Sequence, residues 1–137
     1  MRKSILAVCL VVSAFAAVSA SVQSDAAPAA APNVQRKVLL QQDLSIPNYS
    51  TALVEVTIPA GGREGRHTHP GSAVVYVQEG QLTLDYEGMP TKTYKVGESF
   101  YIEPGKIHEG INNGATTVKA IASFVVEKGK PLASPAQ

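Results

Sequence analysis

Residues 61–80 read GGREGRHTHPGSAVVYVQEG, and this stretch decides how the rest of the chain is interpreted. It places two of the three histidines of the chain, His67 and His69, one residue apart. Alternate residues of a β-strand share a face, with Cβ atoms roughly 6.5–7 Å apart. Two imidazoles at this spacing can turn toward one ion, and imidazole is a common ligand of divalent transition metals. The pair is therefore a candidate metal site, although two exposed loop histidines would give the same pattern.

A second stretch, residues 97–112, reads GESFYIEPGKIHEGIN and carries the third histidine, His108. It follows the first pair by roughly forty residues, with a predicted pair of strands between them. Three histidines retained in two separate, turn-bounded segments favour one shared site. The alternative is a barrel that has lost its metal and keeps the histidines without a role.

Short apolar segments separated by turn residues run through the chain after residue 35. Residues 50–58 alternate with period two, as a half-buried strand does, and Asn113-Gly114 is a strong turn signal. No part of this region has a helical period, so the fold is predicted to be an all-β sandwich or barrel. The predicted strands are residues 37–41, 50–58, 73–78, 81–86, 91–96, 98–102, 106–112 and 117–127.

The N-terminal 20 residues have the three parts of a secretory signal peptide. Arg2 and Lys3 precede an apolar run, and residues 18–20 read VSA, a typical cleavage sequence. Residues 21–34 are rich in Ala and Pro and are predicted to be a flexible linker. The expected organisation is a signal peptide (1–20), this linker, a β-barrel domain (35–128) and a C-terminal tail (129–137). We therefore expect a periplasmic or secreted protein with no stable membrane anchor after cleavage.

The composition narrows the possible functions. Cleavage after Ala20 leaves 117 of the 137 residues, with 10 basic and 11 acidic side chains and a net charge of −1. The sequence has no basic cluster, so no nucleic-acid partner is expected. Cys9 is the only cysteine and leaves with the signal peptide, so the mature chain offers no thiolate ligand or nucleophile.

The two histidine-bearing stretches resemble the two motifs of the cupin superfamily. In the first, Gly61, His67, His69 and Gly80 lie in the register of the motif, and in the second Gly97, Gly105, His108 and Asn112 do. Glu103 stands where the second motif has a proline, with Pro104 one place later. The resemblance covers roughly residues 50–126, and the chain is similar to small exported single-domain cupins. It implies a cupin-type double-stranded β-helix, or jelly-roll, barrel.

The resemblance also implies that His67, His69 and His108 face the barrel interior and bind one divalent transition metal ion. The identity of the ion stays open among Fe, Mn, Ni, Cu, Co and Zn. The glutamate ligand of the family motif falls on Ala73. A site of three neutral imidazoles should leave the ion more positive and more open to water or substrate than the usual site does.

Other polar residues are weaker candidates for a role in the metal site, either as a replacement for the missing carboxylate or as hydrogen-bonding partners. For Glu64, Glu79 and Glu109 we favour the interpretation of solvated surface charges, since Glu109 should point away from the face of His108. Tyr86 and Asn112 are possible supporting residues of the site that would act through hydrogen bonds. The simpler roles are core packing for Tyr86 and turn formation for Asn112.

Three functional hypotheses remain open from the sequence. The first is a metal-dependent enzyme, an oxidoreductase of dioxygenase type or an isomerase, acting on a small polar molecule in the barrel. The second is a non-catalytic periplasmic module that binds a small molecule or a metal; the lack of an evident general acid or base favours it. The third is an assembly role, in which residues 35–44 pair with the sheet edge of a second copy to form a homodimer.

Overall fold

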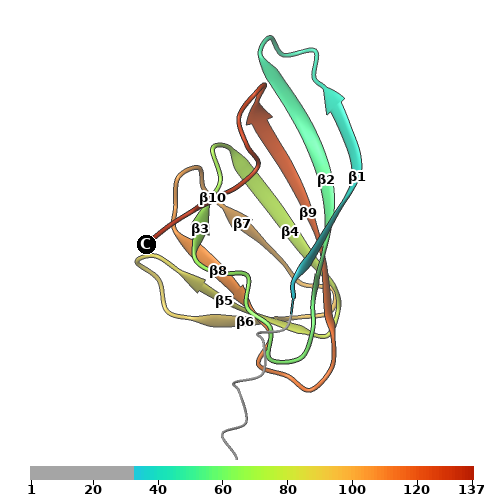
Figure 1. Cartoon of the computed structure of the whole chain (residues 1–137), viewed down its shortest axis with the longest axis vertical. Coiled ribbons are helices and arrows are strands. Elements are labelled where there is room, and N and C mark those ends of the chain that lie inside the picture. Colours follow the sequence, from blue (N-terminus) through green and yellow to red (C-terminus); the bar gives the residue numbers. More distant parts are fainter. Residues whose placement is uncertain (1–32) are drawn as a thin grey trace, which may run out of the picture.

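A computed structural model describes residues 33–137, which form ten β-strands and no helix (Figure 1). The all-β prediction is confirmed for this part of the chain. The predicted signal peptide and nearly all of the predicted linker lie outside the described residues. Within residues 33–137, no helix is long and apolar enough to cross a membrane.

The strands form two five-stranded sheets between which the chain passes repeatedly. The first sheet, sheet A, has the order β1 (Gln35–Asp43), β2 (Tyr49–Ile58), β9 (Val118–Glu127), β4 (Ser72–Glu79), β7 (Ser99–Ile102). The second, sheet B, has the order β10 (Ser134–Pro135), β3 (His67–Thr68), β8 (His108–Ile111), β5 (Gln81–Tyr86), β6 (Lys92–Lys95). The pairings are all antiparallel, so segments distant in sequence become neighbours.

The alternating pattern of the long strands explains why they form the frame of sheet A. Along β2, every second side chain from Ser50 to Ile58 is buried, and those between are partly exposed. The paired strand β9 alternates in the same way from Val118 to Val126. Because β-branched side chains suit a pleated surface with one buried face, this sequence favours strands with a single packing face.

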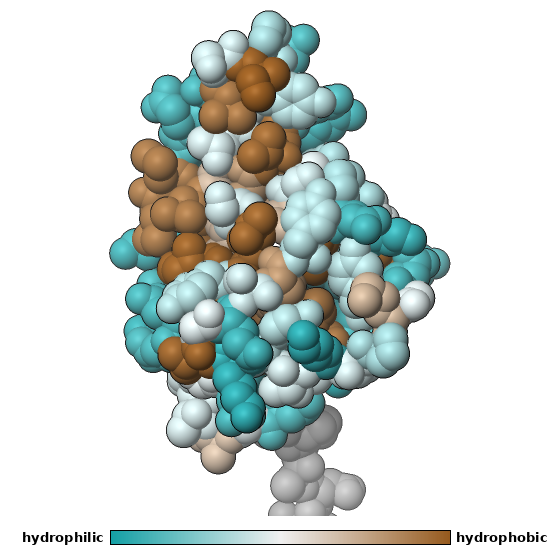
Figure 2. Space-filling view, turned by 180° about the vertical axis from the view of Figure 1, so that it is seen from behind, coloured by the Kyte–Doolittle hydropathy of each residue, from teal (hydrophilic) through white to brown (hydrophobic). Residues whose placement is uncertain are grey.

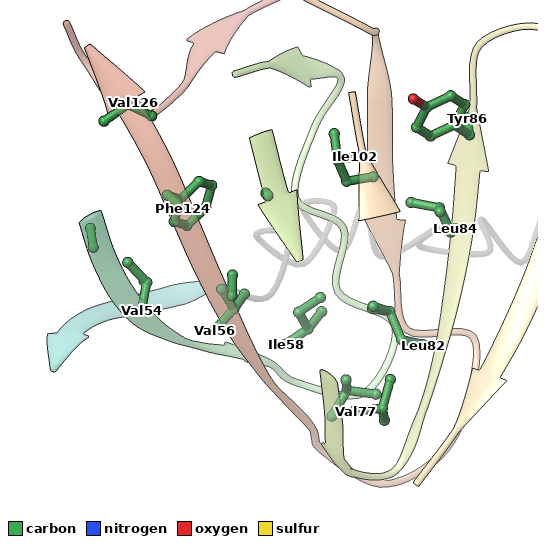
Figure 3. Packing of buried hydrophobic residues seen from close by; sticks show 14 residues of the cluster. Val54, Val56, Ile58, Val77, Leu82, Leu84, Tyr86, Ile102, Phe124 and Val126 are labelled. Atoms are coloured by element: carbon green, nitrogen blue, oxygen red, sulfur yellow. The ribbon is translucent and has the colours of Figure 1, made fainter. Parts of the chain in front are cut away.

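The hydrophobic core lies between the two sheets. The close view shows side chains of sheet A facing those of β5 across the interior (Figure 3). Burial of this apolar surface is the main force that holds the two sheets together. The labelled members are Val54, Val56, Ile58, Val77, Ile102, Phe124 and Val126 from sheet A and Leu82, Leu84 and Tyr86 from sheet B.

The C-terminal tail contains a short strand that was not among the predicted strands. Residues Ser134 and Pro135 form β10 and pair with Thr68 and His67 of β3. A short strand that contains proline gives little sequence signal, because proline is usually confined to strand edges and turns. The tail is thus part of sheet B, next to the first histidine pair.

Strand β1 forms one edge of sheet A and is longer than predicted. All nine of its residues are exposed, and they include the apolar Val38, Leu39 and Leu40. Figure 2 shows apolar residues gathered over the upper left of the molecule, the part that β1 and β2 reach in Figure 1. The edge strand therefore offers both unpaired backbone groups and apolar side chains.

Candidate metal centre

The structure brings the three predicted histidines together in the barrel. His67 lies in β3, His69 follows directly after it, and His108 begins β8 and is paired with His67. All three are buried, with 4–8% of their surface exposed. Their ring centroids lie 4.3–4.9 Å apart. One nitrogen from each ring lies within 4.8 Å of the other two, a group that can hold a metal ion.

Hydrogen bonds to backbone carbonyls determine which nitrogen of each histidine ring carries the proton. Nδ1 of His67 lies 2.8 Å from the carbonyl oxygen of Gly65, and Nδ1 of His69 lies 2.7 Å from that of Leu132. Nδ1 of His108 lies 3.0 Å from the carbonyl of Lys106. Because a carbonyl oxygen can only accept, each Nδ1 carries the proton and donates it. Each neutral ring is then left with its Nε2 lone pair available for a metal, as in metal-binding histidines generally.

The Nε2 atoms of His69 and His108 face one another at 3.1 Å. Two nitrogen lone pairs at this distance repel unless a cation lies between or beside them. Metal–nitrogen bonds of about 2.0–2.1 Å in tetrahedral or octahedral geometry separate neighbouring nitrogens by about 2.9–3.4 Å. The residues present therefore fit one transition metal ion bound through Nε2.

Burial favours the neutral form of His69 and His108. Loss of solvent lowers the pKa of His69 to about 4, although its hydrogen bond to Leu132 opposes the shift. Loss of solvent likewise lowers the pKa of His108 to about 4, with the Lys106 carbonyl opposing. The other histidines add smaller decreases, as does the guanidinium of Arg36 on His69. Metal ligands must be deprotonated, so a neutral group at pH 7 is prepared to bind.

A cavity of about 120 Å³ lies between the sheets and is lined by His69 and His108. Most of its remaining wall is aliphatic or aromatic, contributed by β2, β5, β7 and β9. The exceptions among its lining residues are Arg36 and Glu64, the two charged side chains at the cavity. The arrangement suits a small molecule held against the histidines with most of its surface away from water.

The wall at Ala73 is apolar. Ala73 is 1% exposed and is paired with Ile102 on one side and Phe124 on the other. The Phe124 ring packs edge-on against His69, with centroids 4.8 Å apart. This side of the histidine group therefore presents hydrocarbon, with no carboxylate on β4 at that position.

Tyr86 and Asn112 occupy different surroundings. The Tyr86 ring stacks on His108 with centroids 6.2 Å apart, and its hydroxyl accepts a hydrogen bond from the backbone N–H of Glu103. The amide of Asn112 donates to the carbonyls of Ile58 and Thr116, and its oxygen accepts from the N–H of Gly114. Tyr86 thus borders the site, while the contacts of Asn112 are those of a turn-forming residue.

Two of the three carboxylates interpreted as solvated surface charges are not solvated. Glu109 is 5% exposed, and Arg63 holds it with two hydrogen bonds. The side-chain hydrogen bond and charge of Arg63 lower the pKa of Glu109, despite an opposing effect of burial. The Glu64 side chain is only 13% exposed. The surface interpretation was wrong for these two because the segment before His67 folds back over β8, whereas Glu79 is exposed as expected.

Sequence reasoning missed two contributors to the site. Arg36 comes from β1, which the sequence marked only as an apolar strand, and Leu132 comes from the tail. Leu132 acts through its backbone carbonyl, which no side-chain pattern reveals. Arg36 could have been noticed as a charge preceding an apolar strand, but its partner lies 28 residues away.

Comparison with known proteins agrees with the fold. Residues 54–126, more than half of the chain, match the model of the cupin domain. Germin-like protein subfamily 2 member 2 of Arabidopsis thaliana is 35% identical over 80 residues. That alignment spans 55% of this chain but only 36% of the plant protein.

Solved structures show the same architecture. A double-stranded β-helix protein from Klebsiella pneumoniae has a TM-score of 0.62 and 21% identity, with 80% of this chain and 87% of that chain covered. A recombinant oxalate oxidase in complex with glycolate has a TM-score of 0.56 and 24% identity, over 62% of this chain and 45% of that chain. With the buried histidine group and the family match, the conclusion is plain: the chain is a member of the cupin family.

Proposed function

We propose that this protein is an exported cupin that binds one divalent transition metal ion and uses it as an enzyme on a small polar molecule. The observation that carries the metal site is the geometry of the histidines. Three Nδ1–H groups are committed to backbone carbonyls, and the lone pairs of His69 and His108 meet at 3.1 Å. A cation is the simplest partner for such a set of donors.

The neutral ligand set supports a reactive role. Three imidazoles leave the full double positive charge on the ion and occupy only part of its coordination sphere. A bound metal would polarise an oxygen atom of the ligand, the usual contribution of such ions to catalysis. The chain itself supplies the fixed imidazoles and the apolar wall of Phe124 and Ile102, which limits contact of a bound molecule with water.

The relatives indicate the reaction classes to test first. One solved structure with the same fold is an oxalate oxidase that holds glycolate, and another is a DMSP lyase. Glycolate is a small molecule that carries a hydroxyl and a carboxylate group. We propose oxidase- and lyase-type reactions for testing beside the dioxygenase-type and isomerase-type chemistry that the cupin resemblance implies, with the metal chosen from Fe, Mn, Ni, Cu, Co and Zn.

A non-catalytic binding module is the second candidate. It is favoured by the apolar lining of the cavity, where Arg36 and Glu64 are the only charged side chains among the lining residues. The two candidates differ in turnover. Each metal-loaded form should be tested for oxygen consumption and for conversion of phenolic, keto-acid, hydroxy-acid and sugar substrates. Binding without turnover across this panel would favour the module.

Metal analysis tests the site itself. The mature protein, purified without a histidine tag, should contain close to one transition metal ion per chain after loading and desalting. The double variant His67→Ala/His108→Ala should contain none, and a chelator should lower the melting temperature of the wild type only. Equal metal in both proteins would contradict the site.

Export and assembly complete the proposal. The first 20 residues support export, which a mass measurement of the protein recovered from the periplasm or medium would test.

The exposed apolar edge strand β1 supports a homodimer formed through this edge. Light scattering should give twice the mass of one chain; a monomer at high concentration would contradict this.

A further inference from the structure

We propose that Glu64 supplies the carboxylate of the metal pocket. It enters the barrel from the loop between β2 and β3 and takes the place of the glutamate that the family motif has at the position of Ala73. In this role Glu64 accepts a hydrogen bond from a water molecule or hydroxyl group bound at the open position of the metal. The inference rests on the proposed metal site. It goes beyond that site by assigning a further residue and by favouring ligands that carry a hydroxyl group.

The backbone around Glu64 is fastened to strand β8. Arg63 forms a β-bridge with Ile111, and the N–H of Glu64 donates to the carbonyl of Gly110 at 3.0 Å. On the other side of β8, the carboxylate of Glu109 accepts from the N–H of Gly65 and from the guanidinium of Arg63. Glu109 therefore holds the loop from outside, so that Glu64 is directed inward.

The absence of a side chain at Gly110 makes room for the Glu64 carboxylate. Gly110 is two residues from His108 on a strand, so both share the inner face. A Cβ atom built on Gly110 would collide with Oε2 of Glu64 and lie 3.1 Å from its Cδ, and the next residue that it would meet is Leu82 in the core at 3.4 Å. The carboxylate thus lies against the inner face of β8, at the position that a Gly110 side chain would occupy, two residues along the strand from His108.

Arg36 fixes the orientation of this carboxylate. Its guanidinium donates to Oε1 of Glu64 at 3.1 Å. Arg36 lines the same cavity and lies near enough to His69 to lower the pKa of that ring. The bond to Arg36 occupies Oε1, so Oε2 is the oxygen available for a second donor.

The distances favour an indirect contact with the metal. Glu64 lines the cavity together with His69 and His108. Its carboxylate is not among the candidate ligand atoms that all lie within 4.8 Å of one another, which come from the three histidines. A carboxylate oxygen that reaches a metal through a bound oxygen lies no more than about 4.8 Å from the ion, because the coordination bond and the hydrogen bond meet at an angle. Glu64 is therefore a positioning residue that acts through the molecule on the metal.

The outer face of the same sheet offers a matched control. Asp85 pairs with Arg66 at 3.2 Å, much as Glu64 pairs with Arg36, but both partners are exposed and lie away from the cavity. Glu64→Gln and Asp85→Asn each remove one negative charge without changing the shape of the side chain. The difference between them isolates the position of the carboxylate inside the barrel.

The experiment measures the affinity for Co²⁺ alone by competition with a chromophoric chelator. Glu64→Gln should weaken binding about 10- to 100-fold, the usual effect of losing a supporting carboxylate. Asp85→Asn should stay within twofold of the wild type. The melting temperature in chelator should match that of the wild type for both, since a merely structural role would lower it and leave the affinity unchanged.

Gly110→Ala gives an independent test, because its Cβ displaces only the end of the Glu64 side chain. It should weaken Co²⁺ binding as much as Glu64→Gln does. The double variant should be no worse than either single variant, since both remove the same contact. Additive losses would overturn the assignment.

The outcomes separate this inference from the proposed function. If Glu64→Gln binds Co²⁺ as tightly as the wild type while His67→Ala/His108→Ala binds none, the metal site stands and the role of Glu64 is wrong. If the wild type and the histidine variant bind Co²⁺ equally, the metal site itself is wrong.

Discussion

The two sheets of this barrel differ in how they are built. Sheet A contains four strands of eight to ten residues, and β2 and β9 pair along their whole lengths. Sheet B carries His67 and His108 on strands of two and four residues, with the two-residue β10 at its edge. Sheet A is stabilised by apolar packing, whereas the site depends on a few hydrogen bonds and ion pairs. Stability and metal binding should therefore respond to different mutations.

The largest expected effect on stability lies in sheet A. Ile58→Ala removes a side chain that is 1% exposed at the end of β2, and should lower the free energy of unfolding by about 2–5 kcal/mol. Urea denaturation in chelator measures the loss. The folded fraction should still bind one metal ion per chain. Loss of metal binding in protein that is still folded would show that metal binding depends on the packing of sheet A.

Acid should weaken sheet B next. The pKa of His69 and His108 is about 4 in the folded protein, against 6.5 for an ordinary histidine. As the pH falls below 6.5, the unfolded chain takes up protons that the folded chain takes up only near pH 4. The free energy of unfolding of the metal-free protein should therefore fall between these values, by about 2–4 kcal/mol in total, less than two full shifts of this size would give because solvent still screens part of each ring.

Urea denaturation at several pH values in chelator measures this dependence. Loading with metal should steepen it, because protons then compete with the ion for the same nitrogens. A stability that stays constant from pH 6.5 to pH 5 would contradict the buried, neutral histidines.

The ion pair that holds the loop before His67 should have a smaller effect. Arg63→Met leaves the carboxylate of Glu109, which is 5% exposed, without its charged partner. We expect the free energy of unfolding to fall, because a poorly solvated carboxylate loses its charged partner. Arg66→Met is the control, since its pair with Asp85 is exposed and should cost less than about 0.5 kcal/mol. Equal losses would mean that burial of Glu109 is unimportant.

The smallest effect on stability, with a marked effect on the site, is expected from the tail. Removal of residues 131–137 deletes β10 and the Leu132 carbonyl that orients His69. Metal affinity should fall about 10- to 100-fold, while the melting temperature in chelator should fall about as much as in Leu132→Ala, since the Leu132 side chain packs against the core. Full-length Leu132→Ala keeps the carbonyl and should bind metal like the wild type. Unchanged affinity in the truncated protein would remove the tail from the site.

The same contrast explains what the sequence could predict. The bounds of Gln81–Tyr86 were predicted correctly because its apolar residues, Leu82, Leu84 and Tyr86, occupy alternate positions. Turn residues also lie on both sides of this strand. The three histidines were found because their spacing matches two motifs. Both signals lie within short segments of the sequence, so they can be recognised without knowing how distant segments meet in the fold.

The rest depends on contacts between distant segments. Glu109 was correctly expected to point away from His108, but the loop that covers it could not be seen from parity alone. The meeting of Arg36 with Glu64 joins residues 28 positions apart. The contribution of Leu132 is a backbone carbonyl 63 residues from His69. Such contacts follow from how the sheets are closed, which single-segment patterns do not encode.

Anomalous diffraction from crystals loaded with Co²⁺ or Zn²⁺ tests the central claim most directly. The account predicts one strong peak per chain, about 2.0–2.2 Å from the Nε2 atoms of His67, His69 and His108. The three Nδ1 atoms should remain bonded to the carbonyls of Gly65, Leu132 and Lys106. A peak elsewhere, or no peak inside the barrel of a fully loaded crystal, would contradict it.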